Sequence, residues 1–215
     1  MSIMKSSNKI YTTLAIIVLI AGSYAFFNSR GQELIITNYY DDAPTLPIIV
    51  MVGDSLVEGF GASKRNSLPE QLGKKLSVPV LNLGISGSTT QDVLRRVNDV
   101  PQNAYLVIII AGGNDVLKRV PEEETLANMQ AIISRLHEQG SIVAIASVKS
   151  SFFGEGSLTQ KYQAIAKETG SIYLGSILSG VYGNDSLMSD SIHPNDAGYT
   201  IIADNIHELI ERFIN

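Results

Sequence analysis

Residues 48–56 of the chain read IIVMVGDSL, an apolar run that stops at Gly53 and passes directly into Asp54 and Ser55. A short, continuous apolar run that ends at a turn residue is typical of a strand buried on both faces of a sheet. Strands of this kind occur in parallel sheets whose two faces are covered by helices. The stretch therefore predicts an α/β fold in which polar residues follow the carboxyl end of a central strand.

The rest of the chain repeats this pattern of apolar runs and amphipathic segments. Further strands are predicted over residues 78–83, 105–111, 142–148 and 171–174. Helices are predicted over residues 67–76, 89–97, 121–139 and 195–213. Strands that alternate with helices of this length form a parallel sheet with helices on both faces. We therefore expect a three-layer α/β/α sandwich around a central, mostly parallel, five-stranded sheet.

Composition excludes several classes of function. The 215 residues include no Cys, which rules out a disulfide scaffold, a thiol nucleophile and a metal or iron–sulfur site built on Cys ligands. Three His are too few for a His-rich metal site. The formal net charge of −5 argues against a nucleic-acid partner, because nucleic-acid-binding domains normally carry a basic excess. Any chemistry is therefore expected to use oxygen and nitrogen nucleophiles.

The N-terminal segment differs in character from the rest. Lys5 and Lys9 precede an uncharged run over residues 10–27 with a strongly apolar centre. A basic region before an apolar stretch is typical of an export signal, here with cleavage after Ala25. The run is also close to the ~17–20 residues that span a bilayer, so an uncleaved anchor fits equally well. A buried N-terminal helix of a cytosolic domain is the remaining alternative.

We therefore divide the chain into three parts. Residues 1–27 are expected to form a signal peptide or membrane anchor, residues 28–46 a linker, and residues 47–215 the folded domain. Two Lys before the apolar run, against the single Arg30 after it, favour a cytoplasmic N-terminus. The domain is then expected to be exported, either to the periplasm or to the outer side of the inner membrane. In the second case, residues 10–27 would associate with the membrane.

Two polar motifs provide a nucleophile and a base. Ser55 stands on a turn directly after a predicted strand, which is where an exposed nucleophilic hydroxyl would lie. Such a hydroxyl needs a base that takes its proton. Asp190 and His193 stand three apart, a spacing that lets a carboxylate orient an imidazole. Taken alone, Gly53-Asp54-Ser55 could equally be a turn that caps the next helix.

Of the three His, one is a good candidate for the base. A second Asp-x-x-His pair, Asp204 and His207, lies inside an amphipathic run and is expected on a solvated helix face. His137 lies within a predicted helix and is expected to be a surface residue. His193 directly precedes Pro194, which places it in a loop just before a helix. By elimination, His193 is the candidate base.

Two further segments at strand ends carry hydrogen-bond donors. They read NLGISG over residues 82–87 and GGND over residues 112–115. An acyl-transfer site needs donors aimed at the developing oxyanion, and a Gly N–H or an Asn amide supplies one without adding charge. Each segment alone is also compatible with an ordinary turn, because Gly and Asn are turn formers.

The chain resembles the SGNH, or GDSL, hydrolase family, which is named for a Ser-Gly-Asn-His set. The corresponding residues here, in this order, are Ser55, Gly84, Asn114 and His193. The resemblance covers essentially residues 48–213 and is closest to the arylesterase and acyl-thioesterase/lysophospholipase branch. Four blocks carry it: G-D-S-L-x-x-G-[YF]-G at residues 53–62, N-x-G-x-S-G-x-T-T at 82–90, G-x-N-D at 112–117, and D-x-x-H-P-N-x-x-G-Y at 190–199.

The resemblance implies a flavodoxin-like fold and two-step ester hydrolysis through an acyl-enzyme. It implies that Ser55 is the nucleophile, His193 the general base and then acid, and Asp190 the orienting carboxylate. The backbone N–H groups of Ser55 and Gly84 and the side chain of Asn114 would form the oxyanion hole. The resemblance also implies that there is no metal and no cofactor. We expect a monomer that acts on a small-molecule acyl ester.

One family feature is missing from the chain. The branch commonly carries P-x-x-Y-G after the fourth strand, whereas residues 148–156 read VKSSFFGEG. Preferences of the branch for chain length and headgroup therefore do not carry over. Phe60, Phe152 and Phe153 are candidates either for an apolar acyl site or for core packing.

The leading hypothesis is an exported esterase for small acyl or aryl esters or lysophospholipids. A thioesterase or a deacetylase of cell-envelope carbohydrate would use the same triad. From other classes, a non-catalytic envelope binding protein on this fold predicts loss of the Ser, Asn or His, and all are present. A nucleotide-binding α/β domain has only Gly59 and Gly61 in its support.

Overall fold

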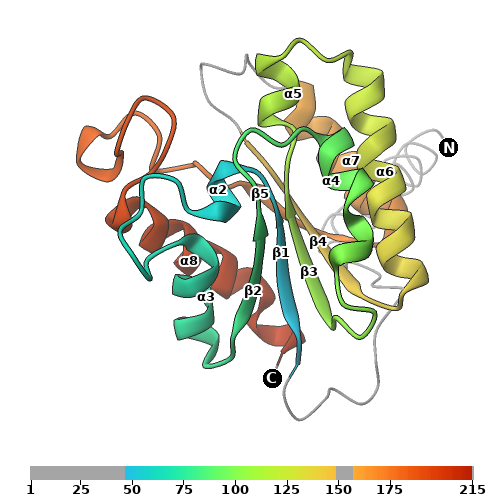
Figure 1. Ribbon diagram of the computed structural model, residues 1–215, viewed down its shortest axis with the longest axis horizontal. Helices are drawn as coiled ribbons and strands as arrows, with labels where there is room; N and C mark the ends of the chain where they lie inside the picture. The colour runs from blue at the N-terminus through green and yellow to red at the C-terminus, as the bar shows by residue number, and fades with distance from the viewer. Residues whose placement is uncertain (1–46, 149–156, 215) are drawn as a thin grey trace, which may run out of the picture. The chain divides into compact units, whose positions relative to one another are not determined.

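A five-stranded parallel sheet lies at the centre of the fold (Figure 1). The computed structural model describes residues 47–148 and 157–214. In spatial order the strands are β2 (Val80–Gly84), β1 (Ile49–Gly53), β3 (Leu106–Ile110), β4 (Ile142–Ser147) and β5 (Ile172–Ser176). All neighbouring pairs are parallel, so the predicted sheet is confirmed and the carboxyl ends of its strands share one edge.

Helices cover both faces of the sheet, which confirms the three-layer arrangement (Figure 1). One face is covered by α3 (Leu68–Leu76) and α8 (Asp196–Ile210), and the other by α4 (Thr90–Arg95), α6 (Glu122–Glu138) and α7 (Ser157–Thr169). Two short helices, α2 (Ser55–Glu58) and α5 (Gly113–Leu117), begin just after β1 and β3. The described residues also form short 3-10 helices: η1 (Val97–Asp99), η3 (Asp185–Leu187) and η4 (Glu211–Phe213).

Alternate residues of the central strands fill two separate cores. Val50 and Val52 of β1 belong to the core under α4, α6 and α7, whereas Ile49 and Met51 belong to the core under α3 and α8. Successive side chains of a strand point to opposite faces, so a strand buried on both faces must be apolar throughout. All residues of β1 and β3 are buried, as their continuous apolar runs predict.

Two elements differ from the sequence expectation. The apolar run at residues 78–83 predicts a fully buried strand, but β2 lies at the edge of the sheet and Leu81 is 41% exposed. An edge strand has a neighbour on one side only, so its burial is incomplete. Helix α7 is missing from the predicted set, although Tyr162, Ile165 and Ala166 form a buried stripe at helical spacing.

Polar side chains define where the main helices begin. Ser67 and Glu70 form a capping box at the start of α3, and Thr89 and Asp92 form another at the start of α4. The side chain of Asn195 accepts hydrogen bonds from the first turn of α8. The loop that precedes α8 therefore ends at a defined point.

Several predictions concern residues outside the described part of the chain. The signal peptide or anchor (1–27), the linker (28–46), and Phe152 and Phe153 all lie there and stay predictions. Over residues 47–148 and 157–214, none of the helices has the length and apolar character needed to cross a bilayer.

Candidate active site

Ser55 lies at the carboxyl end of β1, as the first residue of α2. Asp54 caps this helix, because its Oδ1 accepts a hydrogen bond from the Leu56 N–H at 3.0 Å. Gly53 lets β1 approach β3 closely, since a Cβ there would lie 2.0 Å from the carbonyl oxygen of Ile110. This sharp turn from strand to helix presents the Ser55 hydroxyl at the edge of the sheet.

Three side chains form a continuous hydrogen-bonded chain. Ser55 Oγ lies 3.0 Å from His193 Nε2. Nδ1 of the same imidazole lies 2.8 Å from Asp190 Oδ2 and 3.1 Å from Oδ1. The structure thus brings together the three residues that the sequence predicts as nucleophile, base and orienting carboxylate. A carboxylate at Nδ1 holds a proton there, which leaves Nε2 free to accept the proton of the Ser hydroxyl.

Asp190 is also bonded to the backbone of the loop that it orients. Its Oδ1 accepts hydrogen bonds from the N–H of Ile192 at 2.7 Å and of His193 at 2.8 Å. Burial alone would raise the pKa of this carboxyl. The backbone hydrogen bonds, the bond to the His193 side chain and the charge of that side chain together outweigh burial and hold the pKa below its ordinary value of 3.8. Asp190 is therefore ionised at neutral pH.

Phe60 lies against the imidazole ring. The ring centroids of Phe60 and His193 are 4.4 Å apart and the ring planes are inclined by 44°. Phe60 is 52% exposed and lines the cavity beside Ser55, so it belongs to the site and not to the core. Its backbone is fixed on both sides, because its N–H donates to the Ser55 carbonyl and its carbonyl accepts from the hydroxyl of the buried Tyr199 at 2.8 Å.

The other two His lie away from this site. His207 of α8 faces Glu211, with 3.7 Å between Nδ1 and Oε2, and Asp204 pairs with Lys75. The second Asp-x-x-His pair therefore lies on a helix surface, as the sequence predicts. His137 is half-buried in α6, where burial lowers its pKa, so the prediction of a surface residue is only partly right. In the described part of the chain, no three His, Asp or Glu are placed to hold a metal ion.

A cavity of about 200 Å³ opens beside Ser55 and His193. Its lining includes Ser55, Gly87 and Asn114, three residues that each carry a hydrogen-bond donor: the backbone N–H groups of Ser55 and Gly87 and the side-chain amide of Asn114. Neither backbone N–H has an acceptor among the residues that the structure describes. Donors placed in this way can stabilise negative charge on an oxygen next to the nucleophile. The apolar part of the lining consists of Leu56, Phe60, Leu117, Val148, Leu178 and Ile192.

Gly84 does not belong to this group of donors, in contrast to the sequence expectation. It is the last residue of β2, its N–H donates to Asn82 Oδ1 at 2.9 Å, and it does not line the cavity. Close packing requires glycine there, since a Cβ would lie 2.0 Å from the backbone nitrogen of Glu58. Of the glycines in residues 82–87, the one that lines the cavity is Gly87, in the turn beyond the strand. Its φ of +78° favours glycine, but the sequence alone does not rank it above Gly84.

Asn114 lies in α5, just after the carboxyl end of β3. Its Nδ2 donates to the Ser88 carbonyl at 3.1 Å and lies 3.4 Å from Asp54 Oδ2. Asp54 is 3% exposed, and burial raises the pKa of its carboxyl to about 6. The two contacts hold the Asn114 amide between the turn that carries Ser55 and the turn that carries Gly87.

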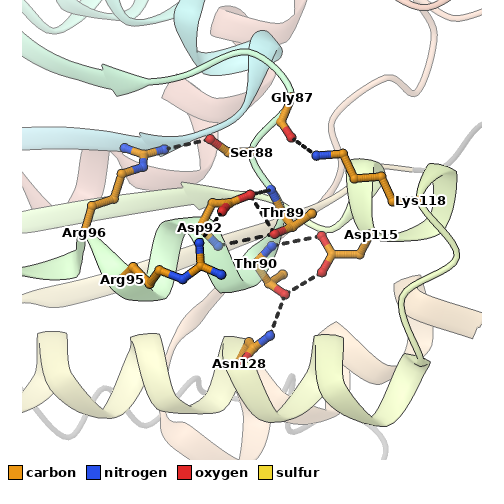
Figure 2. Close-up of polar contacts among 10 residues, drawn as sticks. All are labelled: Gly87, Ser88, Thr89, Thr90, Asp92, Arg95, Arg96, Asp115, Lys118 and Asn128. Atoms are coloured by element: carbon orange, nitrogen blue, oxygen red, sulfur yellow. Dashed lines mark hydrogen bonds and ion pairs between the residues drawn. The ribbon is translucent and has the colours of Figure 1, made fainter.

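The residue after Asn114 anchors a neighbouring helix (Figure 2). The buried carboxylate of Asp115 accepts hydrogen bonds from the Thr90 N–H at 2.9 Å and from Thr90 Oγ1 at 2.6 Å. Asn128 of α6 in turn donates to Thr90 Oγ1 at 3.2 Å. These contacts fix the start of α4 relative to Asn114.

A family model matches the region that contains this site. The model of the GDSL-like lipase/acylhydrolase family matches residues 51–201, which is more than half of the chain. The chain belongs to the GDSL-like lipase/acylhydrolase family. It is therefore a carboxylic ester hydrolase, and the resemblance seen in the sequence is confirmed.

Two named relatives of this GDSL hydrolase are esterases. The esterase TesA of Pseudomonas aeruginosa is 25% identical over 170 residues, which is 74% of this chain and 85% of TesA. An arylesterase of Vibrio mimicus is 30% identical over 108 residues, which is 47% of this chain and 54% of the arylesterase.

Solved structures of other hydrolases share the fold of this GDSL hydrolase. The crystal structure of TesA superposes with a TM-score of 0.71 at 23% identity, over 77% of this chain and 99% of TesA. The esterase EstA from Pseudoalteromonas sp. superposes with a TM-score of 0.69 at 23% identity, over 78% of this chain and 98% of EstA. These likenesses confirm the predicted fold class.

Proposed function

We propose that this GDSL hydrolase is a serine esterase that cleaves small acyl or aryl esters through an acyl-enzyme. The observation that carries the proposal is the hydrogen-bonded chain from Ser55 Oγ through the His193 imidazole to Asp190, at one wall of the cavity. A Ser hydroxyl is a weak nucleophile until an adjacent base takes its proton. His193 stands at the right distance to act as that base.

In the first step, Ser55 Oγ attacks the acyl carbon of the ester while His193 Nε2 takes the hydroxyl proton. The electron pair of the carbonyl bond moves to its oxygen, which accepts hydrogen bonds from the Ser55 and Gly87 N–H groups and from the Asn114 amide. The amide N–H that turns to this oxygen is the one that makes the long 3.4 Å contact with Asp54. The bond from the acyl carbon to the alcohol oxygen then breaks, and His193 gives its proton to that oxygen. The acyl group remains on Ser55 as an ester.

In the second step, a water molecule takes the place of the departed alcohol. His193 accepts a proton from this water as its oxygen attacks the acyl carbon, and the same donors stabilise the oxyanion. The bond to Ser55 Oγ then breaks, and Oγ regains a proton from His193. Asp190 stays ionised throughout and balances the charge of the imidazolium, which its lowered pKa favours. The products are one carboxylic acid and one alcohol or phenol.

The described walls of the cavity favour a small apolar acyl or aryl group. Its volume of about 200 Å³ is smaller than the roughly 300–1,000 Å³ of common ligand pockets. Leu117, Leu178 and Ile192 supply apolar lining. No Lys or Arg is among the described residues that line the cavity. We therefore favour small acyl or aryl esters over lysophospholipids.

The test is hydrolysis of p-nitrophenyl acetate, butyrate, octanoate and palmitate by the full-length chain and by its Ser55→Ala variant. We expect the wild type to prefer the shorter esters and the variant to be inactive. Lysophosphatidylcholine, a butyryl thioester and an acetylated oligosaccharide test the lysophospholipase, thioesterase and deacetylase alternatives. Equal hydrolysis by both proteins, or no hydrolysis of any ester by the wild type, would contradict the proposal.

We also propose that the domain acts outside the cytoplasm, as a monomer. Export is supported by the basic residues Lys5 and Lys9 followed by the apolar run over residues 10–27. The mass of the protein from periplasmic and membrane fractions should show either cleavage after Ala25 or retention of the anchor. Unprocessed protein confined to the cytosolic fraction would contradict export, and a dimer in light scattering would contradict the monomer.

A further inference from the structure

Two basic side chains hold the loop that follows β2. We name residues 85–89 the donor loop, because Gly87 lies in it. We propose that Arg96 and Lys118 are positioning residues of the oxyanion hole, which hold the Gly87 N–H in place beside Ser55. This proposal rests on the esterase function proposed above and adds residues that do not themselves touch the substrate.

Arg96 joins the carboxyl ends of β1 and β2. Figure 2 shows its contact with Ser88. Its side chain donates from Nη1 to the Leu83 carbonyl at 2.5 Å, and from Nη2 to the Gly53 carbonyl at 2.6 Å and towards Ser88 Oγ at 3.5 Å. Gly53 leads into the turn that carries Ser55, and Leu83 leads into the donor loop. A guanidinium is a rigid fork of donors, so it fixes its acceptors relative to each other. Arg96 therefore sets the spacing between the nucleophile and the donor loop.

Lys118 holds the donor loop from another helix (Figure 2). It caps the C-terminal end of α5, and its Nζ donates to the Gly87 carbonyl at 2.7 Å. Because a charged donor makes a strong hydrogen bond, this contact restrains the peptide group between Gly87 and Ser88 and so limits the backbone rotation of Gly87. The Lys118 N–H also donates to the carbonyl of Asn114. Lys118 therefore connects the two residues that face Ser55 across the cavity.

Packing does little to fix Gly87. Ile85 is 53% exposed, and a Cβ on Gly87 would have no atom within 4 Å. Glycine also has more backbone freedom than any other residue. A further contact, from the Ser86 N–H to the Glu58 carboxylate at 2.6 Å, fixes the residue before Gly87. Oxyanion donors are effective only when they are oriented before the reaction. The side-chain contacts of this loop therefore act together with the backbone hydrogen bond from the Ser88 N–H to the Ile85 carbonyl, at 3.1 Å, to orient Gly87.

The experiment compares two variants of the full-length chain with matched controls. Lys118→Met removes the donor from an exposed position and should not affect folding. Arg96→Lys keeps the charge but cannot bond both strand ends with one rigid fork. The controls are the exposed neighbours of each residue, Arg119→Met and Arg95→Lys, and the Arg95 side chain bonds Asp92 instead of the donor loop.

The measurements are kcat and KM for p-nitrophenyl butyrate, Ki for phenylboronic acid, and Tm. We expect kcat of both variants to fall about tenfold with KM within about twofold, because loss of a whole oxyanion donor costs ~10²–10³ in kcat. Phenylboronic acid forms a tetrahedral adduct on a Ser nucleophile and places a negative oxygen at the donors. Its Ki should therefore rise by the same factor as kcat falls. Lys118→Arg, which keeps a charged donor, should restore both values.

Wild-type kcat and Ki in both variants would overturn the proposal, while a Ser55→Ala variant without activity would show that the esterase function stands. A lower Tm with unchanged Ki would assign these residues a purely structural role and overturn it as well. An equal loss of kcat in the control variants Arg119→Met and Arg95→Lys would also overturn the proposal. If the wild type shows no Ser55-dependent activity, the proposed function itself fails and the positioning role fails with it.

Discussion

The carboxylate of Asp190 contacts His193 at two places, the imidazole Nδ1 and the backbone N–H. The residue that orients the base is therefore bonded to both the ring and the main chain of that base. These two hydrogen bonds limit rotation of the imidazole about the Cα–Cβ bond of His193. Phe60 packs against the ring from a third direction. The imidazole reaches Ser55 from a loop whose geometry is set locally.

Asp190→Asn should lower kcat by about 10⁴, the loss known when a triad carboxylate becomes an amide. The Oδ1 atom of Asn can still accept the backbone hydrogen bonds of Ile192 and His193. Its amide group, facing Nδ1, instead favours the tautomer with the proton on Nε2, which cannot accept the Ser55 proton. Hydrolysis of p-nitrophenyl butyrate and near-UV circular dichroism provide the measurements. Near-wild-type kcat in a folded variant would show that Asp190 does not orient the base.

His193→Ala should abolish turnover, whereas His207→Ala should leave it close to the wild-type value. Only His193 lies at hydrogen-bond distance from Ser55, while His207 faces Glu211 on α8. Steady-state hydrolysis of p-nitrophenyl acetate by the two variants provides the comparison. The reverse ranking would identify the pair Asp204 and His207 as the functional one.

Phe60→Ala should lower kcat/KM by roughly two- to tenfold, because an aromatic ring contact contributes about 0.5–1.5 kcal/mol. The side chain is more than half exposed, so the free energy of unfolding should change by less than about 0.5 kcal/mol. Leu209→Ala is the matched control, since Leu209 is also exposed, at 42%, but lies in α8 and not at the cavity. Equal kcat/KM in both variants would remove Phe60 from the site.

Stability should depend on pH through Asp54, whose pKa burial raises from 3.8 to about 6. The folded protein keeps this proton to higher pH than the unfolded chain does. The stability that Asp54 contributes is therefore fully present below about pH 4 and is lost as pH rises to about 6. Asp54→Asn does not titrate, so its stability relative to wild type should rise by about 3 kcal/mol across this window.

Urea unfolding of wild type and Asp54→Asn at a series of pH values measures that difference. The comparison uses the change in this stability difference between about pH 4 and pH 6. The introduced amide also faces the Asn114 side chain, which shifts the difference by the same amount at every pH. Asp185→Asn, an exposed carboxyl in η3, is the control. A difference that stays constant with pH would contradict a raised pKa for Asp54.

Thr90→Val should destabilise the fold by about 1.5–3 kcal/mol, the cost of losing a hydrogen bond to a buried charged group. Valine has nearly the same shape, but it leaves Asp115 Oδ1 without its short bond and Asn128 without its acceptor. Chemical denaturation measures the effect, with Ser134→Ala on the exposed face of α6 as the control. A loss no larger than in the control would show that the network adds little stability.

The sequence predicts the elements best where burial leaves a single choice of residue type. β1 and β3 must be apolar at every position, so their runs are unmistakable. Helix α7 is harder to detect, because its buried stripe is narrow and polar residues surround Tyr162, Ile165 and Ala166. The edge position of β2 depends on the order of strands in space, which the apolar run at residues 78–83 does not encode.

The residues of the site also differ in how well the sequence identifies them. Ser55 and His193 can be picked out because the chain has few His and one of them lies in a loop before a helix. The choice between Gly84 and Gly87 is of another kind, since both are glycines near one strand end. The choice depends on which backbone N–H already has an acceptor. The N–H of Gly84 has one, because it donates to the side chain of Asn82. Such a contact is visible only in three dimensions.

Ser55 and His193 form a hydrogen bond although 138 positions separate them in the sequence. During synthesis the nucleophile emerges early, and the base emerges only when most of the domain has left the ribosome. Until the loop before α8 has docked, Ser55 has no proton acceptor and the nascent chain is inert toward esters. Ester cleavage therefore requires that the chain extends at least to His193 and that its loop has docked. A truncated product that ends before Asp190 would be inactive even if its other elements fold.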